Sequence, residues 1–275
     1  MGTHALLIGA GDLGTDVGLR LAALGHEVTA VRRRGDLVPS PMRGISADLT
    51  RERPDLAGVE ADLLVVALTA RPRSEEAYRA TYVDGMTRAL EALAATGQSP
   101  RRAVLVSSTG VYGDAPPDPV LDEDSPAVPA DGPARMLLEA ERTFHRHLPQ
   151  GTVLRLSGLY RGETARLVDQ VRTGTFDDPH RWTNRVHRDD AAAAVVHLLT
   201  RAEQPASLYV GTDDEPSLLG DVAAHVARQL DVPSPEPADP ARGHGKRLSN
   251  ARLRASGWRP AHPTYREGYV VEPRD

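Results

Sequence analysis

The chain has 275 residues, 40% of them apolar, and a formal net charge of −5 at pH 7, which fits a globular protein of one or two domains. The negative charge gives no support to nucleic-acid binding, and the absence of cysteine excludes disulfides and thiolate metal sites. No stretch of about 18 apolar residues occurs. Residues 1–11 run into a strand-like segment without a signal-peptide pattern. We therefore expect a cytoplasmic protein with no membrane partner.

Arginine replaces lysine almost throughout the chain. There are 33 basic residues, and Lys246 is the single lysine. This looks like a compositional bias, so an arginine is weaker evidence of function here than in most proteins.

Apolar runs alternate with helical patterns along the chain. Six runs predict buried strands: residues 4–9, 27–31, 62–68, 103–108, 152–157 and 207–211. Apolar residues spaced three or four apart predict helices: residues 13–24, 74–97, 131–142, 163–174, 189–202 and 217–230. Residues 232–245 are rich in proline and glycine and predict an exposed loop. Such alternation predicts an α/β fold with a doubly wound parallel sheet.

The segment GAGDLG at residues 9–14 has the GxGxxG spacing, follows a predicted strand and opens a predicted helix. Gly9 would permit the tight turn, Gly11 the approach of a pyrophosphate, and Gly14 the close packing of helix and strand. The helix N-terminus would then offer N–H groups to the phosphates. The alternative is a strand–helix turn without a ligand. The context favours a dinucleotide-binding Rossmann domain.

The second predicted strand ends in Val31-Arg32-Arg33-Arg34, with no carboxylate to hold a ribose 2′-hydroxyl. A guanidinium suits a 2′-phosphate through its charge and its forked donors. We therefore predict NADP(H), with NAD(H) as the alternative. The competing interpretation is a solvated arginine run in an arginine-rich chain.

Other predicted cofactor contacts follow the strand ends. Asp48, after the presumed third strand, would face the adenine amino group, and residues 67–69 would line the adenosine and phosphate region. The full predicted set is Gly9, Gly11, Asp12, Leu13, Gly14, Arg32, Arg33, Asp48, Leu49, Ala67, Leu68, Thr69, Ser107, Leu159 and Tyr160. We expect residues 1–158 to form the dinucleotide-binding domain, with 186–215 returning to it, and residues 159–275 to form a smaller C-terminal substrate lobe.

Several motifs occur in the order of a known family. They are GAGDLG, DLLVVAL (62–68), VSSTGVYG (106–113), LRLSGLYRG (154–162) and NRVHRDDAAAA (184–194). Together they resemble the extended short-chain dehydrogenase/reductases, in particular the NAD-dependent epimerase/dehydratase family. The ending KRLSNARLRASGW (246–258) with PTYREGY (263–269) resembles a shorter, atypical branch.

The resemblance implies a mechanism with a serine, a tyrosine and a lysine. The serine binds the substrate oxygen, the tyrosine transfers the proton, and the lysine lowers the tyrosine pKa and binds the nicotinamide ribose. Alignment through VYG places the serine at Ser108, whereas alignment of the next helix places the other two roles at Pro133 and Leu137. Neither residue has an ionisable group, and no YxxxK occurs anywhere in the chain. We predict that the usual acid/base pair is absent.

Three side chains are the candidates for the remaining chemistry: Ser108, Tyr112 and His187. Each has a structural alternative: a strand-end hydrogen bond for Ser108, a packed aromatic ring for Tyr112 and a buried histidine for His187. Beside His187, Asp189 or Asp190 is expected to cap the next helix. No metal-ligand spacing and no GxSxG elbow occur, so we predict no metal site and no hydrolase.

Two functions remain from the sequence. The first is an NADP(H)-dependent oxidoreductase or epimerase/dehydratase-like enzyme acting on a small hydroxyl or carbonyl compound, with nucleotide sugars among the candidates. Arg181, Trp182 and Arg185 could then clamp an anionic or nucleotide-like substrate, or they could equally be surface residues. The second is a catalytically silent NADP(H)-binding protein that regulates a partner or serves as a scaffold. For the protein as a whole, we expect a small-molecule substrate and no nucleic acid as partners, and a monomer or homodimer as the oligomeric state.

Overall fold

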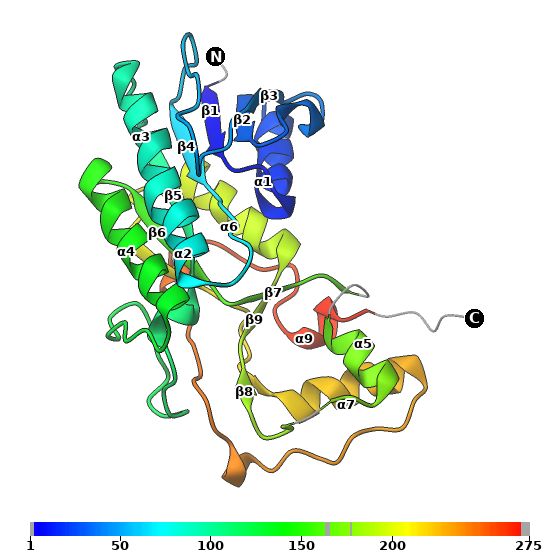
Figure 1. Ribbon diagram of the computed structural model, residues 1–275. Helices are drawn as coiled ribbons and strands as arrows, with labels where there is room; N and C mark the ends of the chain where they lie inside the picture. Colours follow the sequence, from blue (N-terminus) through cyan, green and yellow to red (C-terminus); the bar gives the residue numbers. More distant parts are fainter. Residues whose placement is uncertain (1–2, 163–165, 177, 271–275) are drawn as a thin grey trace. The chain divides into compact units, whose positions relative to one another are not determined.

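The computed structural model describes residues 3–162, 166–176 and 178–270 (Figure 1). The first three residues of the helix predicted at 163–174 lie outside these ranges. So do residues 1–2, 177 and 271–275 of the predicted domains.

The main sheet has seven strands and carries the N-terminal motifs. Their spatial order is β10 (Leu208–Gly211), β6 (Thr152–Leu156), β5 (Arg102–Ser108), β4 (Leu63–Val66), β1 (His4–Ile8), β2 (Glu27–Arg32) and β3 (Arg43–Ser46). Strand β1 pairs in parallel with β2 and with β4, so that Leu7 lies between Ala30 and Val65. This order, with β1 next to β4 and the chain winding outward in both directions, confirms the predicted doubly wound Rossmann sheet.

Helices cover both faces of this sheet, α1 on one and α3 and α4 on the other (Figure 1). The helical elements are α1 (Asp12–Ala23), η1 (Gly35–Leu37), α2 (Glu75–Tyr78), α3 (Met86–Ala95), η3 (Thr109–Tyr112), α4 (Gly132–His147) and α6 (Arg188–Thr200). The strands are apolar on both sides because both faces are covered, and side chains such as Leu6, Leu64 and Leu105 are buried.

The long helix predicted at residues 74–97 is not uniform. A π-helical stretch, η2 (Arg79–Gly85), separates α2 from α3. Ser74 begins the helix as predicted, its Oγ accepting a hydrogen bond from the Ala77 N–H at 3.2 Å. π-Helical turns in α-helices often occur at functional sites. Here the turn carries Thr81, which lines the largest pocket described below.

The chain divides into two compact units. The first comprises Met1–Gly113, Ala127–Arg155 and Ala192–Tyr209, and the second comprises Asp114–Pro126, Leu156–Ala191 and Val210–Asp275. In the second unit β7 (Gly158–Tyr160) pairs in parallel with β9 (Arg185–His187), and β8 (Trp182–Thr183) pairs antiparallel with β11 (Ser217–Leu218). Its helical elements are α5 (Arg166–Thr173), α7 (Leu219–Leu230), η5 (Pro240–Arg242), α8 (Ala251–Ala255) and α9 (Tyr265–Gly268).

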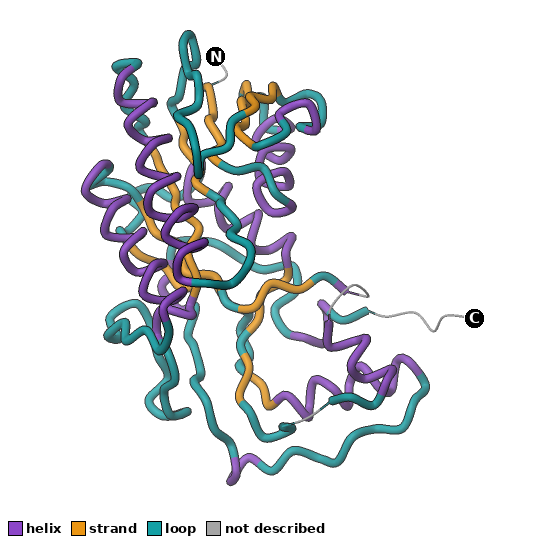
Figure 2. Tube along the Cα trace, in the orientation of Figure 1, coloured by secondary structure: helices purple, strands orange, loops and turns teal. Residues whose placement is uncertain are grey.

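The second unit has an apolar core of its own. Val168 from α5, Val222 and Val226 from α7, and Tyr265 from α9 pack in it. The stretch predicted as an exposed loop at 232–245 is a loop between α7 and α8 that contains only η5, as Figure 2 shows. Within the described ranges, none of the helices is both long enough and apolar enough to cross a membrane.

Candidate functional site

The glycine turn between β1 and α1 is shaped by its backbone. Gly9 has a φ of +100°, and a Cβ there would lie 2.4 Å from the carbonyl oxygen of Ala67. A Cβ on Gly14 would lie 2.3 Å from the carbonyl oxygen of Gly9, whereas a Cβ on Gly11 would meet nothing within 4 Å. Gly11 is the N-cap of α1 and supplies no side-chain cap. The turn therefore has the tight bend, the close packing and the open backbone face that the motif requires.

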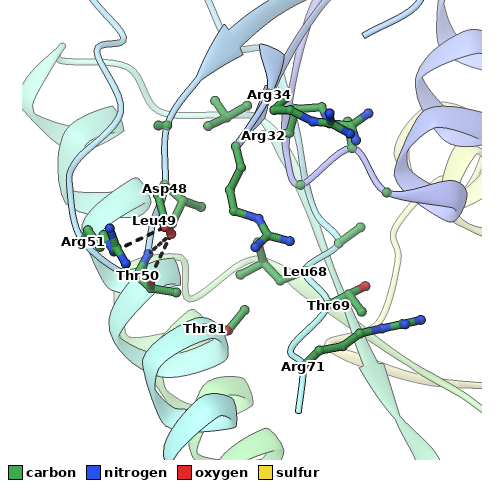
Figure 3. Close-up of a pocket in the computed structure, with 17 residues that line it drawn as sticks. Arg32, Arg34, Asp48, Leu49, Thr50, Arg51, Leu68, Thr69, Arg71 and Thr81 are labelled. Atoms are coloured by element: carbon green, nitrogen blue, oxygen red, sulfur yellow. Dashed lines mark hydrogen bonds and ion pairs between the residues drawn. The ribbon is translucent and has the colours of Figure 1, made fainter. Parts of the chain in front are cut away.

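A pocket of about 820 Å³ lies in the first unit, beside the glycine turn and the carboxyl ends of the strands (Figure 3). Nine predicted cofactor residues line it: Gly9, Gly11, Arg32, Arg33, Asp48, Leu49, Ala67, Leu68 and Thr69. Asp12, Leu13, Gly14 and Ser107 belong to the same unit but are not among its lining residues. Leu159 and Tyr160 belong to the second unit.

Arginines dominate the charge of this pocket. Five of them line it, Arg32, Arg33, Arg34, Arg51 and Arg71, against one acid, Asp48. Figure 3 shows the Arg32 side chain projecting into the space between Asp48 and Thr69. Arg51 and Arg71 were not predicted from the sequence, because each follows its strand by several residues and no spacing rule reaches that far.

Asp48 is held in place by its neighbours. Its Oδ1 accepts hydrogen bonds from the Thr50 N–H at 3.1 Å and the Thr50 hydroxyl at 2.7 Å, and Arg51 Nε lies 3.7 Å from its Oδ2. The Thr50 hydroxyl is the largest cause that lowers the pKa of Asp48, and the nearby arginines act in the same direction. The carboxylate is therefore ionised at neutral pH and can accept a hydrogen bond from an amino group.

The serine predicted to bind substrate stands at the end of β5. Ser108 is half-buried, and its Oγ accepts a hydrogen bond from the Gly110 N–H at 3.1 Å as the N-cap of η3. This is the predicted strand-end role, and it leaves the hydroxyl proton able to donate. Its neighbour Ser107 is buried and donates to Glu141 Oε1 at 2.6 Å.

Helix α4 begins as predicted but carries a different polar residue. Asp131 Oδ1 accepts from the Ala134 N–H at 2.7 Å, and Pro133 lies half-buried in the first turn. Leu137 is only 9% exposed. One turn further on, Glu141 faces inward and pairs with Arg155 of β6 at 2.7 Å. This pair was not predicted from the sequence. Arg155 within the buried strand TVLRL was a signal for it, because a buried charge requires a partner.

Tyr112 is enclosed in the first unit. It is 2% exposed, and the Arg155 guanidinium carbon lies 4.9 Å from its ring centre. This position matches the packed-aromatic alternative, so a direct role for Tyr112 in chemistry stays a prediction.

In the second unit, Tyr160 and His187 belong to a series of contacting rings. Tyr160 stacks on Tyr269 with ring centres 4.4 Å apart and meets His187 edge-on at 5.4 Å. The ring of His187 lies 3.8 Å from that of His262. Burial is the largest cause that lowers the pKa of His187, and His262 lowers it further. His187 is therefore a buried, neutral ring at pH 7, which matches its structural alternative.

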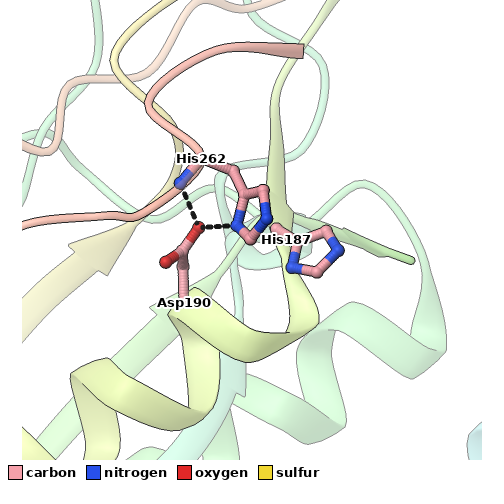
Figure 4. Close-up of side chains that lie close together, drawn as sticks. All are labelled: His187, Asp190 and His262. Carbon is pink, nitrogen blue, oxygen red and sulfur yellow. Dashed lines mark hydrogen bonds and ion pairs between the residues drawn. The ribbon is translucent and has the colours of Figure 1, made fainter. Parts of the chain in front are cut away.

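Asp190 holds this arrangement to the C-terminal segment (Figure 4). Its carboxylate accepts from the backbone N–H of Ala261 at 2.6 Å and from the backbone N–H and Nδ1 of His262, each at 2.9 Å. Helix α6 starts at Arg188, before either acid, so Asp190 does not serve as the cap that the sequence suggested.

The same three side chains form the single group of potential metal ligands found in the described part of the chain, with His187, Asp190 and His262 atoms within 4.8 Å of one another. The two histidine rings face each other, so their in-plane lone pairs do not converge on one point. Asp190 Oδ2 is already engaged by His262. This geometry supplies no argument for a metal.

The residues suggested as a substrate clamp occupy different environments. Arg185 is 5% exposed, donates to Thr183 Oγ1 and lies 3.9 Å from Asp213. Trp182 is half-buried between two smaller pockets of about 370 and 280 Å³. Arg181 is exposed near Asp178. Arg185 is therefore an internal residue of the second unit, and Trp182 lines both of these smaller pockets.

Comparison with known proteins identifies the family of the chain. Residues 5–211 match the model of the NAD dependent epimerase/dehydratase family. A 3-diazoavenalumate denitrifying reductase from a Streptomyces species is 32% identical over 305 aligned positions, which cover 96% of this chain and 98% of that protein. A solved NAD-dependent epimerase/dehydratase structure from Methylobacillus flagellatus is 34% identical with a TM-score of 0.81, covering 97% of this chain and 96% of that one. WbmG of Bordetella bronchiseptica, solved in complex with NAD, has the same fold at 18% identity, with a TM-score of 0.78 over 97% of this chain and 92% of its own.

The fold and the glycine turn thus define an NAD(P)-dependent enzyme of the short-chain dehydrogenase/reductase type. The chain belongs to the NAD-dependent epimerase/dehydratase family. This confirms the resemblance inferred from the motifs, and it establishes a nicotinamide dinucleotide as the cofactor class.

Proposed function

We propose that the protein is an NADP(H)-dependent reductase of a small organic molecule, working without the tyrosine and lysine of its family. The observation that carries the proposal is the charge of the first-unit pocket, in which five arginines face one carboxylate. The positively charged lining would attract the 2′-phosphate that distinguishes NADP(H) from NAD(H). A site specific for NAD(H) would instead have an acidic residue at the end of the second strand.

The residues present fit this cofactor. Gly9 and Gly14 shape the turn, and Gly11 leaves open space where a pyrophosphate would lie against the N-terminus of α1. Asp48 would accept from the adenine amino group, and Arg32 with Arg33 would bind the 2′-phosphate. When bound, the dinucleotide supplies a hydride to the substrate or accepts one from it.

The chain's own contribution to the chemistry centres on Ser108. Its hydroxyl can donate to a substrate oxygen while its Oγ accepts from Gly110. Pro133 and Leu137 cannot exchange a proton at any accessible pH. A carbonyl substrate must then receive its proton from water or from Ser108, so we expect slow turnover with simple carbonyl compounds and nucleotide sugars.

A substrate that needs no proton would suit this site better. The Streptomyces relative is, by its name, a reductase that removes nitrogen from a diazo compound. When an aromatic diazonium ion takes up hydride at the ring carbon, a C–H bond forms and N₂ leaves with the electrons of the C–N bond. This exchange consumes no proton, which favours diazo compounds as a second candidate substrate class beside carbonyl compounds.

The cofactor preference is tested by titration. We expect NADPH to bind at least about tenfold more tightly than NADH, since one charge-assisted hydrogen bond contributes about 1.5–3 kcal/mol. Arg32→Asp should remove the preference, while Arg101→Asp, a charge reversal at an exposed site outside the pocket, should keep it. Equal affinities in the unaltered protein would contradict the NADP(H) assignment.

Turnover is tested by NADPH oxidation with a panel of carbonyl compounds, nucleotide sugars and a stable arenediazonium salt, each corrected for the reaction without protein. With the diazonium salt and 4-deuterated NADPH, we expect deuterium in the arene and no solvent isotope effect. Ser108→Ala should lower carbonyl reduction by about 10²-fold, as the loss of one oxyanion donor does, while Tyr112→Phe should leave it nearly unchanged. No oxidation with any compound, despite tight NADPH binding, would favour the silent regulatory protein.

A further inference from the structure

A buried ion pair lies under the turn that carries Ser108. Glu141 of α4 and Arg155 of β6 are each 5% exposed, and both belong to the first unit. Arg155 Nε lies 3.0 and 3.2 Å from the two carboxylate oxygens of Glu141, and Nη2 lies 2.7 Å from Oε2. The pair is thus a bidentate ion pair between helix α4 and strand β6.

The pair reaches both ends of residues 107–112, the segment that contains Ser108. At the first end, the Ser107 hydroxyl donates to Glu141 Oε1 at 2.6 Å. At the other end, the Arg155 guanidinium carbon lies 4.9 Å from the ring centre of Tyr112, which is itself buried. Between these anchors, Ser108 caps η3 through Gly110.

Stability alone gives little reason to keep such a pair. Two charges that leave water lose hydration, and a well-packed apolar pair of similar volume is often as stable or more stable. An apolar pair, however, could not accept the hydroxyl proton of Ser107 or offer a cation to the ring of Tyr112. Compared with an apolar pair, the charged pair therefore adds two directional contacts, one to Ser107 and one to Tyr112.

We propose that Glu141 and Arg155 are positioning residues that fix the direction of the Ser108 hydroxyl by holding Ser107 and Tyr112 on either side of it. Neither touches the substrate in this scheme. The inference rests on the proposed role of Ser108, and it gives α4 a function although Pro133 and Leu137 replace the acid/base pair.

The chain contains no cysteine, so Ser108→Cys introduces a single thiol at the position in question. Its reaction rate with 5,5′-dithiobis(2-nitrobenzoate), measured against pH, reports the direction and environment of that side chain without any substrate. We expect Ser107→Ala or Glu141→Gln, added to Ser108→Cys, to change the rate at least fivefold and to shift its pH profile. Ser107→Ala removes one hydroxyl and keeps the ion pair, so it serves where Glu141→Gln fails to fold.

The matched control is Ser99→Cys, an exposed position of the same unit, with the same second substitutions. Its rate should stay constant. Rates at position 108 that agree within twofold with and without Ser107→Ala and Glu141→Gln would overturn the inference. So would equal changes at positions 99 and 108, since these indicate general loosening. The proposed role of Ser108 fails separately, if Ser108→Ala leaves the NADPH-dependent reduction of carbonyl compounds unchanged.

Discussion

Two motifs of the family, GAGDLG at residues 9–14 and NRVHRDD at residues 184–190, are used in opposite ways. In the first, a Cβ added to Gly11 would meet no atom within 4 Å among the described residues, so this face of the backbone is open. In the second, Arg185, His187 and Asp190 are buried and engaged with their own unit. A specific sequence pattern therefore marks an open backbone face beside a pocket in one unit and an internal framework in the other.

The difference teaches how to interpret a motif in a single sequence. Glycines mark places where the backbone must come close to something. In the part of the chain that the structure describes, no atom lies within 4 Å of a Cβ added to Gly11, which favours a ligand there. Charged residues in the second motif pointed toward chemistry, but burial requires partners for them, and the fold supplies these partners. Each of the following substitutions changes one of the two motifs or its surroundings, and the measurement shows whether cofactor binding or folding stability changes.

The largest effect is expected at Gly14. Gly14→Ala places a Cβ 2.3 Å from the Gly9 carbonyl oxygen, which forces the turn apart and should cost about 3 kcal/mol of unfolding free energy. Gly11→Val adds a side chain in open space, at a φ of −75° that any residue adopts. It should keep the thermal midpoint and weaken NADPH binding at least about tenfold. A Gly11→Val protein that binds NADPH normally would remove the argument for a pyrophosphate there.

A slightly smaller effect is expected at Asp190 in the second motif. Asp190→Ala removes the acceptor of three hydrogen bonds from residues 261 and 262, two of them from backbone N–H groups. The loss should cost about 2–3 kcal/mol, because three hydrogen bonds to one charged acceptor are lost together. Amide hydrogen exchange at residues 261 and 262 is the measurement. Unchanged protection there would mean that Asp190 is not what holds the segment.

Asp213 gives the second unit a pH dependence. Burial is the largest cause that raises the pKa of its carboxyl from 3.8 to about 7, so the folded state prefers the protonated form. Its contribution to stability is present below about pH 4 and is lost as the pH rises toward 7. Asp213→Asn resembles the protonated acid and should flatten this dependence, gaining on the order of 2 kcal/mol over the unaltered protein at pH 8. Thermal unfolding of both proteins from pH 4.5 to 8 makes the comparison.

The smallest effect is expected at His187, with the opposite sign. Burial and His262 lower its pKa below the usual 6.5, so the neutral ring is favoured in the folded state. The stability that depends on the neutral ring is complete above about pH 6.5 and is lost as the pH falls further. His187→Phe keeps an aromatic ring and should remove the loss of stability at pH 5.5. The Asp213→Asn background separates the two titrations, and an unchanged acid response would exclude His187 as its source.

Local patterns predicted most of the fold and part of the site. Apolar runs correctly predicted six strands of the main sheet, and the capping residues Ser74 and Asp131 correctly predicted the starts of two helices, because these signals act within a few residues. The π-helical turn at 79–85 was not predictable, since the residues that widen it have ordinary helical spacing. Nine of the predicted cofactor residues line the pocket because they follow strand ends.

Contacts over long distances in the sequence escaped prediction. Ser107 and Glu141 are 34 residues apart, and Asp190 and His262 are 72 apart. No local pattern connects such residues, and the many arginines of this chain made Arg155 look unremarkable among them. Whether a charged residue is buried, and therefore needs a partner, is known only once the chain is folded.

The contacts of Asp190 also bear on where this protein can be cut. The family match ends at residue 211, yet the hydrogen bonds to the Asp190 carboxylate come from residues 261 and 262. A fragment that ends at residue 211 would leave the buried Asp190 carboxylate without these hydrogen-bond donors. The boundaries of recombinant fragments and exchanged domains should therefore keep Asp190 together with residues 261 and 262. The segment that has to be kept intact extends at least to His262.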